Sequence, residues 1–317
     1  MAAGLTFGAA AGVKWSGLYA LAAFLVLVTV RDLILRQRIA PRRAWFDTAR
    51  QALVTAAIAL PAALLAYIAT WIGWIVNPGG QDRASGEPWW VSLWEWHAHT
   101  LTWHASLTAE HPYQAHPLTW PLALRPTVMY RLRTEQGADC PWAGGCVSEI
   151  ASLPNPLITW GGVAAVALLL WVAARALWRA ARARSLSPLL SSVHGPALWP
   201  VCFVLVGYLS GWLPWVLTFG RSAVFQFYAV VLTPFAALAL ALVLGSFGSF
   251  GGRAGGVFAL ADIRLDSSRE AVQGRRIAIA ILLIAALALA VIFFPLWSGM
   301  PVAGWFQRAH LWLPGWS

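Results

Sequence analysis

Six apolar stretches, each long enough to cross a bilayer, constrain the fold of this chain more than any other feature. A membrane-spanning helix needs about 20 mostly apolar residues. The stretches lie roughly at residues 5–30, 52–76, 157–178, 197–217, 223–244 and 277–296. Charged residues make up 11% of the chain, against about 25% in soluble domains. The sequence therefore predicts an all-α integral membrane protein with six transmembrane helices.

The distribution of arginine predicts the orientation of these helices. The net charge is +10, and 15 of the 21 Arg lie in the loops 31–50, 175–184 and 253–276. These loops alternate with loops poor in Arg, which is the pattern of cytoplasmic positive charge in membrane proteins. We therefore expect a multi-pass plasma (cell) membrane protein and no nucleic-acid partner.

The longest polar segment, residues 77–156, is expected on the outer side. It holds five of the seven His, seven of the 21 Trp and seven of the twelve acidic residues. A loop of this composition indicates a protein that acts on a substrate at the bilayer surface. The predicted organisation is residues 1–76 with two helices and a basic cytoplasmic loop, 77–156 as the extracytoplasmic loop, and 157–317 with four helices and an external tail.

Within this loop, residues 89–111 predict an amphipathic helix in the headgroup region. Two stripes recur at seven-residue spacing, one of Trp89, Trp96 and Trp103 and one of His97, His104 and His111. Interfacial anchoring is the simpler interpretation of these stripes. The His stripe lacks the HExxH spacing of a zinc site. We therefore predict neither a metal site nor a cofactor.

Two cysteines in the loop predict a disulfide. Cys140 and Cys146 are separated by five residues. A disulfide is the natural interpretation if the loop faces an oxidising exterior, and the second ligand pair of a zinc site is missing from this segment.

Two isolated cations are candidate ligands for an anion. Lys14, the only Lys, falls within the first predicted helix, which begins with a small-residue packing face. Arg221 is the only charge between residues 197 and 252 and lies in a short outer turn. A charge at membrane depth indicates function, and a guanidinium binds phosphate oxygens in a bidentate manner. Anchoring at the interface is the alternative for both.

The segment 111–126 combines aromatic and basic side chains with four prolines. It contains His111, Tyr113, His116, Trp120 and Arg125. Proline fixes φ and removes backbone donors, so the segment is predicted to be rigid and non-helical. It either lines a sugar or peptide site or forms a structural plug on the membrane surface.

The outer loop also supplies carboxylates, the usual bases for transfer to a hydroxyl group. None stands in a pattern that marks it as a base, and we expect all of them to be solvated. They are Asp82, Glu87, Glu95, Glu110, Glu135, Asp139 and Glu149.

Four segments, in this order along the chain, together carry a family resemblance. They are Gly12-Val-Lys-Trp-Ser-Gly-Leu-Tyr19, the segment 111–126, Gly211-Trp-Leu-Pro-Trp215 followed by Arg221 and Phe227-Tyr228, and Phe294-Pro-Leu-Trp-Ser-Gly-Met-Pro301. This set resembles the protein O-mannosyltransferases, in particular the actinobacterial polyprenyl-phosphate-mannose–protein mannosyltransferases.

The resemblance implies a GT-C-type multi-helix bundle and a glycosyltransferase activity. Mannose would pass from polyprenyl-phosphate-mannose to Ser or Thr hydroxyls of secreted proteins, with inversion at the anomeric carbon. The implied partners are the lipid donor, the acceptor proteins, membrane lipid and the secretion machinery. The resemblance supports the segments that contain Lys14, Arg221, His111, His116 and Arg125, and our own hypothesis is that these five residues bind the substrates.

One departure from the family pattern bears on catalysis. The family's acidic pair is an Asp-Glu in the first outer loop, and this chain contains no Asp-Glu dipeptide. We therefore expect a C-terminal portion of the family with no catalytic residue in this chain, the pair being upstream. The alternatives are another polyprenyl-phosphate-sugar transferase and a non-catalytic lipid-binding remnant or subunit.

Overall fold

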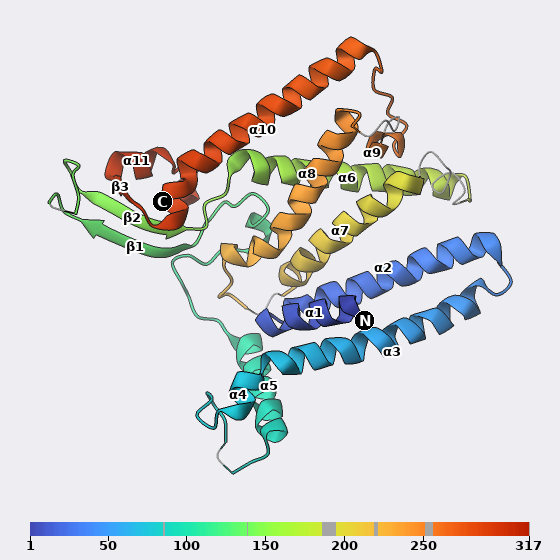
Figure 1. Cartoon of the computed structure of the whole chain (residues 1–317), viewed down its shortest axis with the longest axis horizontal. Coiled ribbons are helices and arrows are strands. Elements are labelled where there is room, and N and C mark those ends of the chain that lie inside the picture. Colours follow the sequence, from blue (N-terminus) through green and yellow to red (C-terminus); the bar gives the residue numbers. More distant parts are fainter. Residues whose placement is uncertain (85, 138, 186–194, 219–220, 251–255, 317) are drawn as a thin grey trace. The chain divides into compact units, whose positions relative to one another are not determined.

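The computed structural model is mostly helical and contains three short strands (Figure 1). It describes the chain except for residues 85, 138, 186–194, 219–220, 251–255 and 317, so Arg253 of the third Arg-rich loop lies outside the described residues. The chain forms two compact units. Unit 1 comprises residues 1–109 and 209–222, and unit 2 comprises residues 110–208 and 223–317.

Six helices of the described chain are long and apolar enough to cross a membrane, which confirms the predicted number. They are α2 (Ser16–Ile39), α3 (Ala44–Thr70), α6 (Pro156–Arg182), the part Ala197–Val216 of α7 (Gly195–Val216), the continuous stretch of η2 (Gln226–Leu232) and α8 (Thr233–Phe247), and α10 (Arg269–Ser298). The shorter helical elements are α1 (Ala2–Val13), α4 (Ile72–Val76), α5 (Trp89–Ser106), η1 (Pro117–Thr119), α9 (Gly256–Ala259), α11 (Gly304–Ala309) and η3 (Pro314–Trp316).

The first predicted helix, residues 5–30, is wrong in one respect, because the structure divides it. Helix α1 ends at Val13, and α2 begins at Ser16. Lys14 lies in the break with an extended backbone (φ −158°, ψ 133°). The Trp15 indole donates a hydrogen bond to the Tyr67 hydroxyl of α3 (3.0 Å). This tertiary contact secures the break, and hydropathy alone cannot reveal it.

The predicted small-residue face of α1 is confirmed by its packing on α3. A Cβ atom on Gly4 would collide with the carbonyl group of Ala59, and one on Gly8 with the carbonyl group of Ala63. Glycine at these positions therefore lets the two backbones approach closely, as small residues do between membrane helices.

A three-stranded antiparallel sheet in unit 2 is an addition to the predicted all-α fold. Its order is β1 (Val128–Thr134), β2 (Cys146–Ala151), β3 (Pro301–Ala303). Tyr130 and Leu132 alternate with Arg131 and Arg133, a two-residue period that is typical of a strand. The β1 strand of this hairpin could therefore have been predicted from the sequence.

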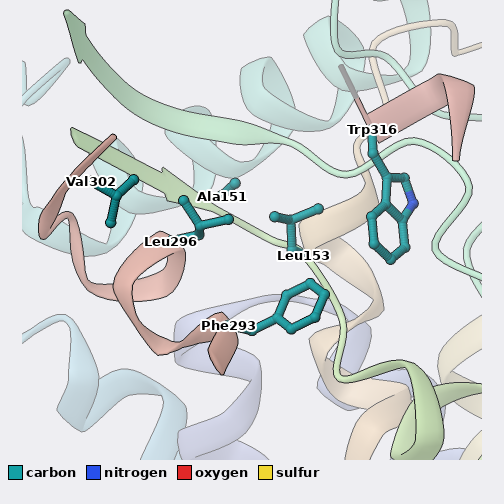
Figure 2. Packing of buried hydrophobic residues seen from close by; sticks show 6 residues of the cluster. All are labelled: Ala151, Leu153, Phe293, Leu296, Val302 and Trp316. Carbon is teal, nitrogen blue, oxygen red and sulfur yellow. The ribbon is translucent and has the colours of Figure 1, made fainter. Parts of the chain in front are cut away.

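The C-terminal tail of the described chain packs on this sheet through a buried apolar cluster (Figure 2). Its members are Ala151, Leu153, Phe293, Leu296, Val302 and Trp316. The Trp316 indole donates to the Ala123 carbonyl oxygen (2.8 Å), and the Trp297 indole donates to that of Leu153 (2.9 Å). These bonds satisfy the indole N–H groups of the buried Trp316 and the half-buried Trp297. The Trp297 bond also ties the end of α10 to the residues that follow β2.

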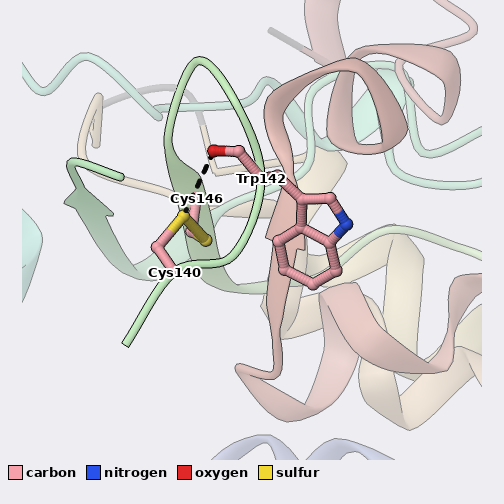
Figure 3. Close-up of a disulfide and its surroundings, with 3 residues drawn as sticks. All are labelled: Cys140, Trp142 and Cys146. Carbon is pink, nitrogen blue, oxygen red and sulfur yellow. Dashed lines mark hydrogen bonds between the residues drawn. A yellow bond between two sulfur atoms is a disulfide. The ribbon is translucent and has the colours of Figure 1, made fainter. Parts of the chain in front are cut away.

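Cys140 and Cys146 form a disulfide at the entrance to β2 (Figure 3). Their Cα atoms are 5.7 Å apart, in the usual range for such a bond. The Trp142 carbonyl oxygen lies 3.8 Å from Sγ of Cys140. The bond closes the small loop that precedes β2.

Candidate functional site

Lys14 and Arg221, the two cations singled out in the sequence, meet in unit 1 at one aromatic ring. Nζ of Lys14 lies 4.9 Å from the centre of the Trp215 ring, and Cζ of Arg221 lies 5.7 Å from the same ring. Both distances are within the range of a cation–π contact. Trp215 lies in the last turn of α7, so the break after α1 and the end of α7 bring the two cations together.

His104, on the last turns of α5, adds a third basic group. The end of α5 is tied to the Arg221 segment, because Ser222 donates from its backbone N to the Leu107 carbonyl oxygen (3.3 Å) and from its hydroxyl to that of Ala109 (3.2 Å). Nδ1 of His104 is buried and has no hydrogen-bond partner among the described residues. We refer to Lys14, His104, Trp215 and Arg221 as the basic cluster.

The electrostatics of the basic cluster disfavour further positive charge. Burial, together with the charge of Arg221, lowers the pKa of Lys14 to about 8. Burial also lowers the pKa of His104, as do the charges of Arg221 and Lys14. A bound anion would reverse these effects, because an opposite charge favours the protonated form. The arrangement is therefore suited to an anionic ligand.

The α5 helix is present as predicted but ends earlier than residue 111. It ends at Ser106, so the predicted stripe of three histidines is wrong for His111. Nδ1 of His97 lies 2.6 Å from the Leu93 carbonyl oxygen, and its Nε2 contacts the Tyr67 hydroxyl. Its ring stacks on Trp15 at 5.5 Å. His97 thus holds α5 against neighbouring aromatic rings.

His104 was singled out by the sequence only as part of that stripe. The seven-residue spacing treats His97 and His104 alike, whereas the structure gives them different surroundings. No group of three or more potential metal ligands occurs in the part of the chain that the structure describes.

The other predicted binding residues belong to unit 2, where they shape the segment 111–126 itself. Nδ1 of His111 accepts from the backbone N of Tyr113 (3.1 Å), and Nδ1 of His116 accepts from that of Leu118 (3.3 Å). Arg125 donates to the Pro112 carbonyl oxygen (2.8 Å). The segment consists of turns and one short 3-10 helix. Its role in substrate binding stays a prediction.

Glu149 corrects the expectation that the outer-loop carboxylates are solvated. Its side chain is 0% exposed and accepts at Oε2 from Arg131 (2.7 Å) and from Gln307 (3.1 Å). Arg131 lies opposite it across the β1–β2 pair. A buried carboxylate with these partners joins the sheet to α11, and solvent does not reach it.

The comparisons with known proteins agree with this architecture. Residues 89–316 match the family model described as the C-terminal four-transmembrane region of protein O-mannosyltransferase. The chain belongs to the protein O-mannosyltransferase family. The matched region begins at the first residue of α5 and includes the hairpin, the four following membrane helices and the tail.

Two curated relatives in the family come from actinobacteria. The chain is 30% identical to the polyprenol-phosphate-mannose–protein mannosyltransferase of Mycobacterium tuberculosis (strain ATCC 25618 / H37Rv), over 99% of this chain and 56% of that protein. It is 29% identical to the protein of that name from Mycolicibacterium smegmatis (strain ATCC 700084 / mc(2)155), over 99% and 57%. The chain thus spans about half the length of these relatives.

A solved structure of the family shares the fold. The match is to the S. cerevisiae protein O-mannosyltransferase Pmt1-Pmt2 complex bound to the sugar donor, with a TM-score of 0.52 and 18% identity. It covers 74% of this chain and 27% of that chain. The multi-helix membrane fold expected from the resemblance is confirmed.

Proposed function

We propose that this chain acts in protein O-mannosylation at the outer face of the plasma membrane. In this reaction mannose passes from polyprenyl-phosphate-mannose to Ser and Thr hydroxyls of exported proteins. The family and the names of the actinobacterial relatives support the reaction. Within the chain, the proposal rests on the basic cluster of Lys14, His104, Trp215 and Arg221.

The reaction develops negative charge on the phosphate of the donor. The bond between the anomeric carbon and a phosphate oxygen breaks, and its electron pair remains on that oxygen. The acceptor hydroxyl oxygen forms the new bond to carbon, and its proton passes to a general base. The departing polyprenyl phosphate therefore carries one more negative charge than the donor. Preorganised positive groups that meet this charge lower the barrier.

Arg221 and Lys14 divide this task according to their chemistry. A guanidinium stays charged at all physiological pH values and binds two phosphate oxygens at once. Lys14, with its pKa lowered to about 8, is mostly protonated at neutral pH and acts as a point charge. The Trp215 ring, which both cations contact, sets where their charges lie.

The proposal assigns no general base to this chain. The resemblance places that role on an Asp-Glu pair, and the sequence has no such dipeptide. Glu149 does not replace it, since it is buried in its pair with Arg131. Donor binding, which needs only the basic cluster, is therefore measured separately from mannosyl transfer, which also needs the base.

The proposed function is tested by mannosyl transfer in membranes in which the chain is expressed together with a segment or partner that carries the Asp-Glu pair of the family. Polyprenyl-phosphate-mannose with a labelled sugar is supplied with a Ser/Thr-rich peptide, and labelled peptide is counted. Arg221→Ala should reduce transfer about 100-fold, the usual effect of removing one preorganised charge-stabilising group. Arg50→Ala, at an exposed position of α3, is the control and should leave transfer unchanged. Transfer within about twofold of wild type in Arg221→Ala would contradict the phosphate role.

Two other functions use the same cluster. Another polyprenyl-phosphate sugar would present the same phosphate, and a panel of sugar donors separates it from mannose. A non-catalytic subunit that binds the lipid, alone or with the secretion machinery, is the other candidate. Such a subunit would bind the donor in an Arg221-dependent manner and leave the rate of transfer unchanged when it is removed from the membranes.

A further inference from the structure

Unit 2 contains a cavity of about 510 Å³ whose walls are mostly apolar. The walls come from the first turns of α6, from η2 and the start of α8, and from the chain around Trp120. Representative lining residues are Trp120, Ile158, Val163, Phe227 and Val230. Because α6 and the η2–α8 stretch are long and apolar enough to cross a membrane, molecules that dissolve in the bilayer are candidate occupants of this cavity.

Gln226 gives this cavity a specific polar point. The residue is 6% exposed, and its Nε2 donates to the Trp120 carbonyl oxygen (2.9 Å). A carbonyl oxygen only accepts hydrogen bonds, so the amide orientation is fixed and Oε1 is the remaining group. Oε1 is buried and has no hydrogen-bond partner among the described residues. An unsatisfied buried acceptor costs about 1–3 kcal/mol, so a ligand that donates a hydrogen bond to this atom would recover that free energy.

Two other polar residues of the wall are already engaged. Asn155 accepts from the backbone N of Ile158 (3.3 Å) and donates to the Ala286 carbonyl oxygen (2.8 Å). The Ser152 hydroxyl oxygen accepts from the backbone N of Thr127 (2.7 Å). Gln226 therefore differs from these neighbours in having a buried acceptor that the described chain does not satisfy.

We propose that this cavity binds the hydroxyl-bearing end of a neutral membrane lipid, whose O–H donates to Oε1 of Gln226. The apolar walls match an isoprenoid or acyl chain, since burial of such a chain is favourable in proportion to its area. An ionised phosphate has no proton to donate and does not match this atom. The cavity thus differs in chemistry from the basic cluster, and the inference stands independently of mannosyl transfer.

The probe for this site is a pair of matched lipids, geranylgeraniol and its methyl ether. Both have the same chain, and only the alcohol donates a hydrogen bond. Their equilibrium affinities are measured on the purified 317-residue chain in nanodiscs, by competition with a photoreactive prenol whose labelled peptide is identified. Wild type should bind the alcohol about tenfold more tightly than the ether, as expected for one buried hydrogen bond.

Gln226→Met removes the acceptor at similar side-chain size and should bind both lipids at the weaker, ether-like affinity. Gln273→Met, at an exposed position of α10, is the matched control and should behave as wild type. If Gln226→Met fails to fold, Ala229→Phe provides a second variant, because Ala229 lines the cavity and a larger side chain there fills it. This variant should lose affinity for both the alcohol and the ether.

Three results would overturn the proposal. Equal binding of alcohol and ether by wild type would mean that water or another group satisfies Oε1. Displacement of the alcohol by methyl α-mannoside would make the cavity a sugar site. Labelling outside the cavity lining would place the lipid elsewhere. Arg221→Ala should leave alcohol binding unchanged, so failure of this proposal and failure of the proposed function are distinguishable.

Discussion

The basic cluster of unit 1 and the Arg131–Glu149 pair of unit 2 place arginine in opposite electrostatic settings. In unit 2 the guanidinium lies 2.7 Å from a fully buried carboxylate of the same chain. In unit 1 Arg221 shares the Trp215 ring with Lys14, and burial together with the charge of Arg221 lowers the pKa of both Lys14 and His104. The first setting satisfies a charge within the fold. The second gathers positive charge that an external anion would stabilise.

This difference separates residues that maintain the fold from residues that bind a ligand. Removing one partner of a buried pair leaves an uncompensated charge, so its effect should appear in the free energy of unfolding. Removing a cation from the basic cluster relieves repulsion between like charges, so its effect should appear in ligand affinity. Four predictions test the contrast, from the largest expected effect to the smallest.

Glu149→Ala should lower the free energy of unfolding by about 3 kcal/mol, because it removes the buried carboxylate that accepts from both the partly buried Arg131 and Gln307. The measurement is denaturant unfolding in detergent micelles, with Glu95→Ala of α5, an exposed carboxylate, as the control. Replacing both partners by apolar residues should recover most of the loss. A loss below about 1 kcal/mol in Glu149→Ala would show that the pair does not hold the sheet to α11.

Arg221→Ala should weaken binding of polyprenyl-phosphate-mannose about 100-fold, and Lys14→Gln about tenfold, since charge-assisted bonds to phosphate are the stronger class. Both cations contact Trp215, so the double variant should lose less than the product of the single effects. Isothermal titration measures the donor affinity of the purified wild type, the two single variants and the double variant. Strict additivity would mean that the two cations bind separate groups.

Cys140→Ser should lower the free energy of unfolding by about 2 kcal/mol, the chain-entropy value for so short a closed loop. The loop precedes β2, which pairs with both other strands, so the loss should appear in unfolding of unit 2. Denaturant curves with and without reductant check this. Wild type in reductant should have the same free energy of unfolding as Cys140→Ser. A difference between the two would contradict the assignment of this stability to the disulfide.

The pH dependence of donor affinity should reflect Lys14. The phosphodiester keeps one negative charge throughout, so the dependence comes from the protein. Lys14 is charged below its pKa of about 8 and loses its proton above it. Affinity should therefore be constant near pH 7 and fall by up to about tenfold as the pH rises above 8, the loss expected for one charge-assisted contact. Lys14→Arg should remove this fall, because arginine stays protonated, and persistence of the fall would assign it to another group.

The sequence predicted the membrane helices better than their ends and contacts. Hydropathy identifies the span of α10 because it depends on composition over many residues. It does not detect the break at Lys14, which depends on the bond between Trp15 and Tyr67, 52 residues away. The cations Lys14 and Arg221 were found because a rare charge in an apolar stretch is visible in one sequence. Gln226 was not found, and His104 was found only as a member of the histidine stripe. Only the fold shows that Nδ1 of His104 and Oε1 of Gln226 are buried without a partner among the described residues.

The most direct test of the central claim is the affinity of the purified chain for two lipids of equal chain length, polyprenyl-phosphate-mannose and polyprenol, in wild type and in Arg221→Ala. The account predicts that the variant loses about 100-fold in affinity for the phosphate lipid, as expected for a charge-assisted bidentate contact, and none for the alcohol. Arg221→Ala with donor affinity within about twofold of wild type, or with equal losses for both lipids, would contradict the assignment of the basic cluster to the donor phosphate.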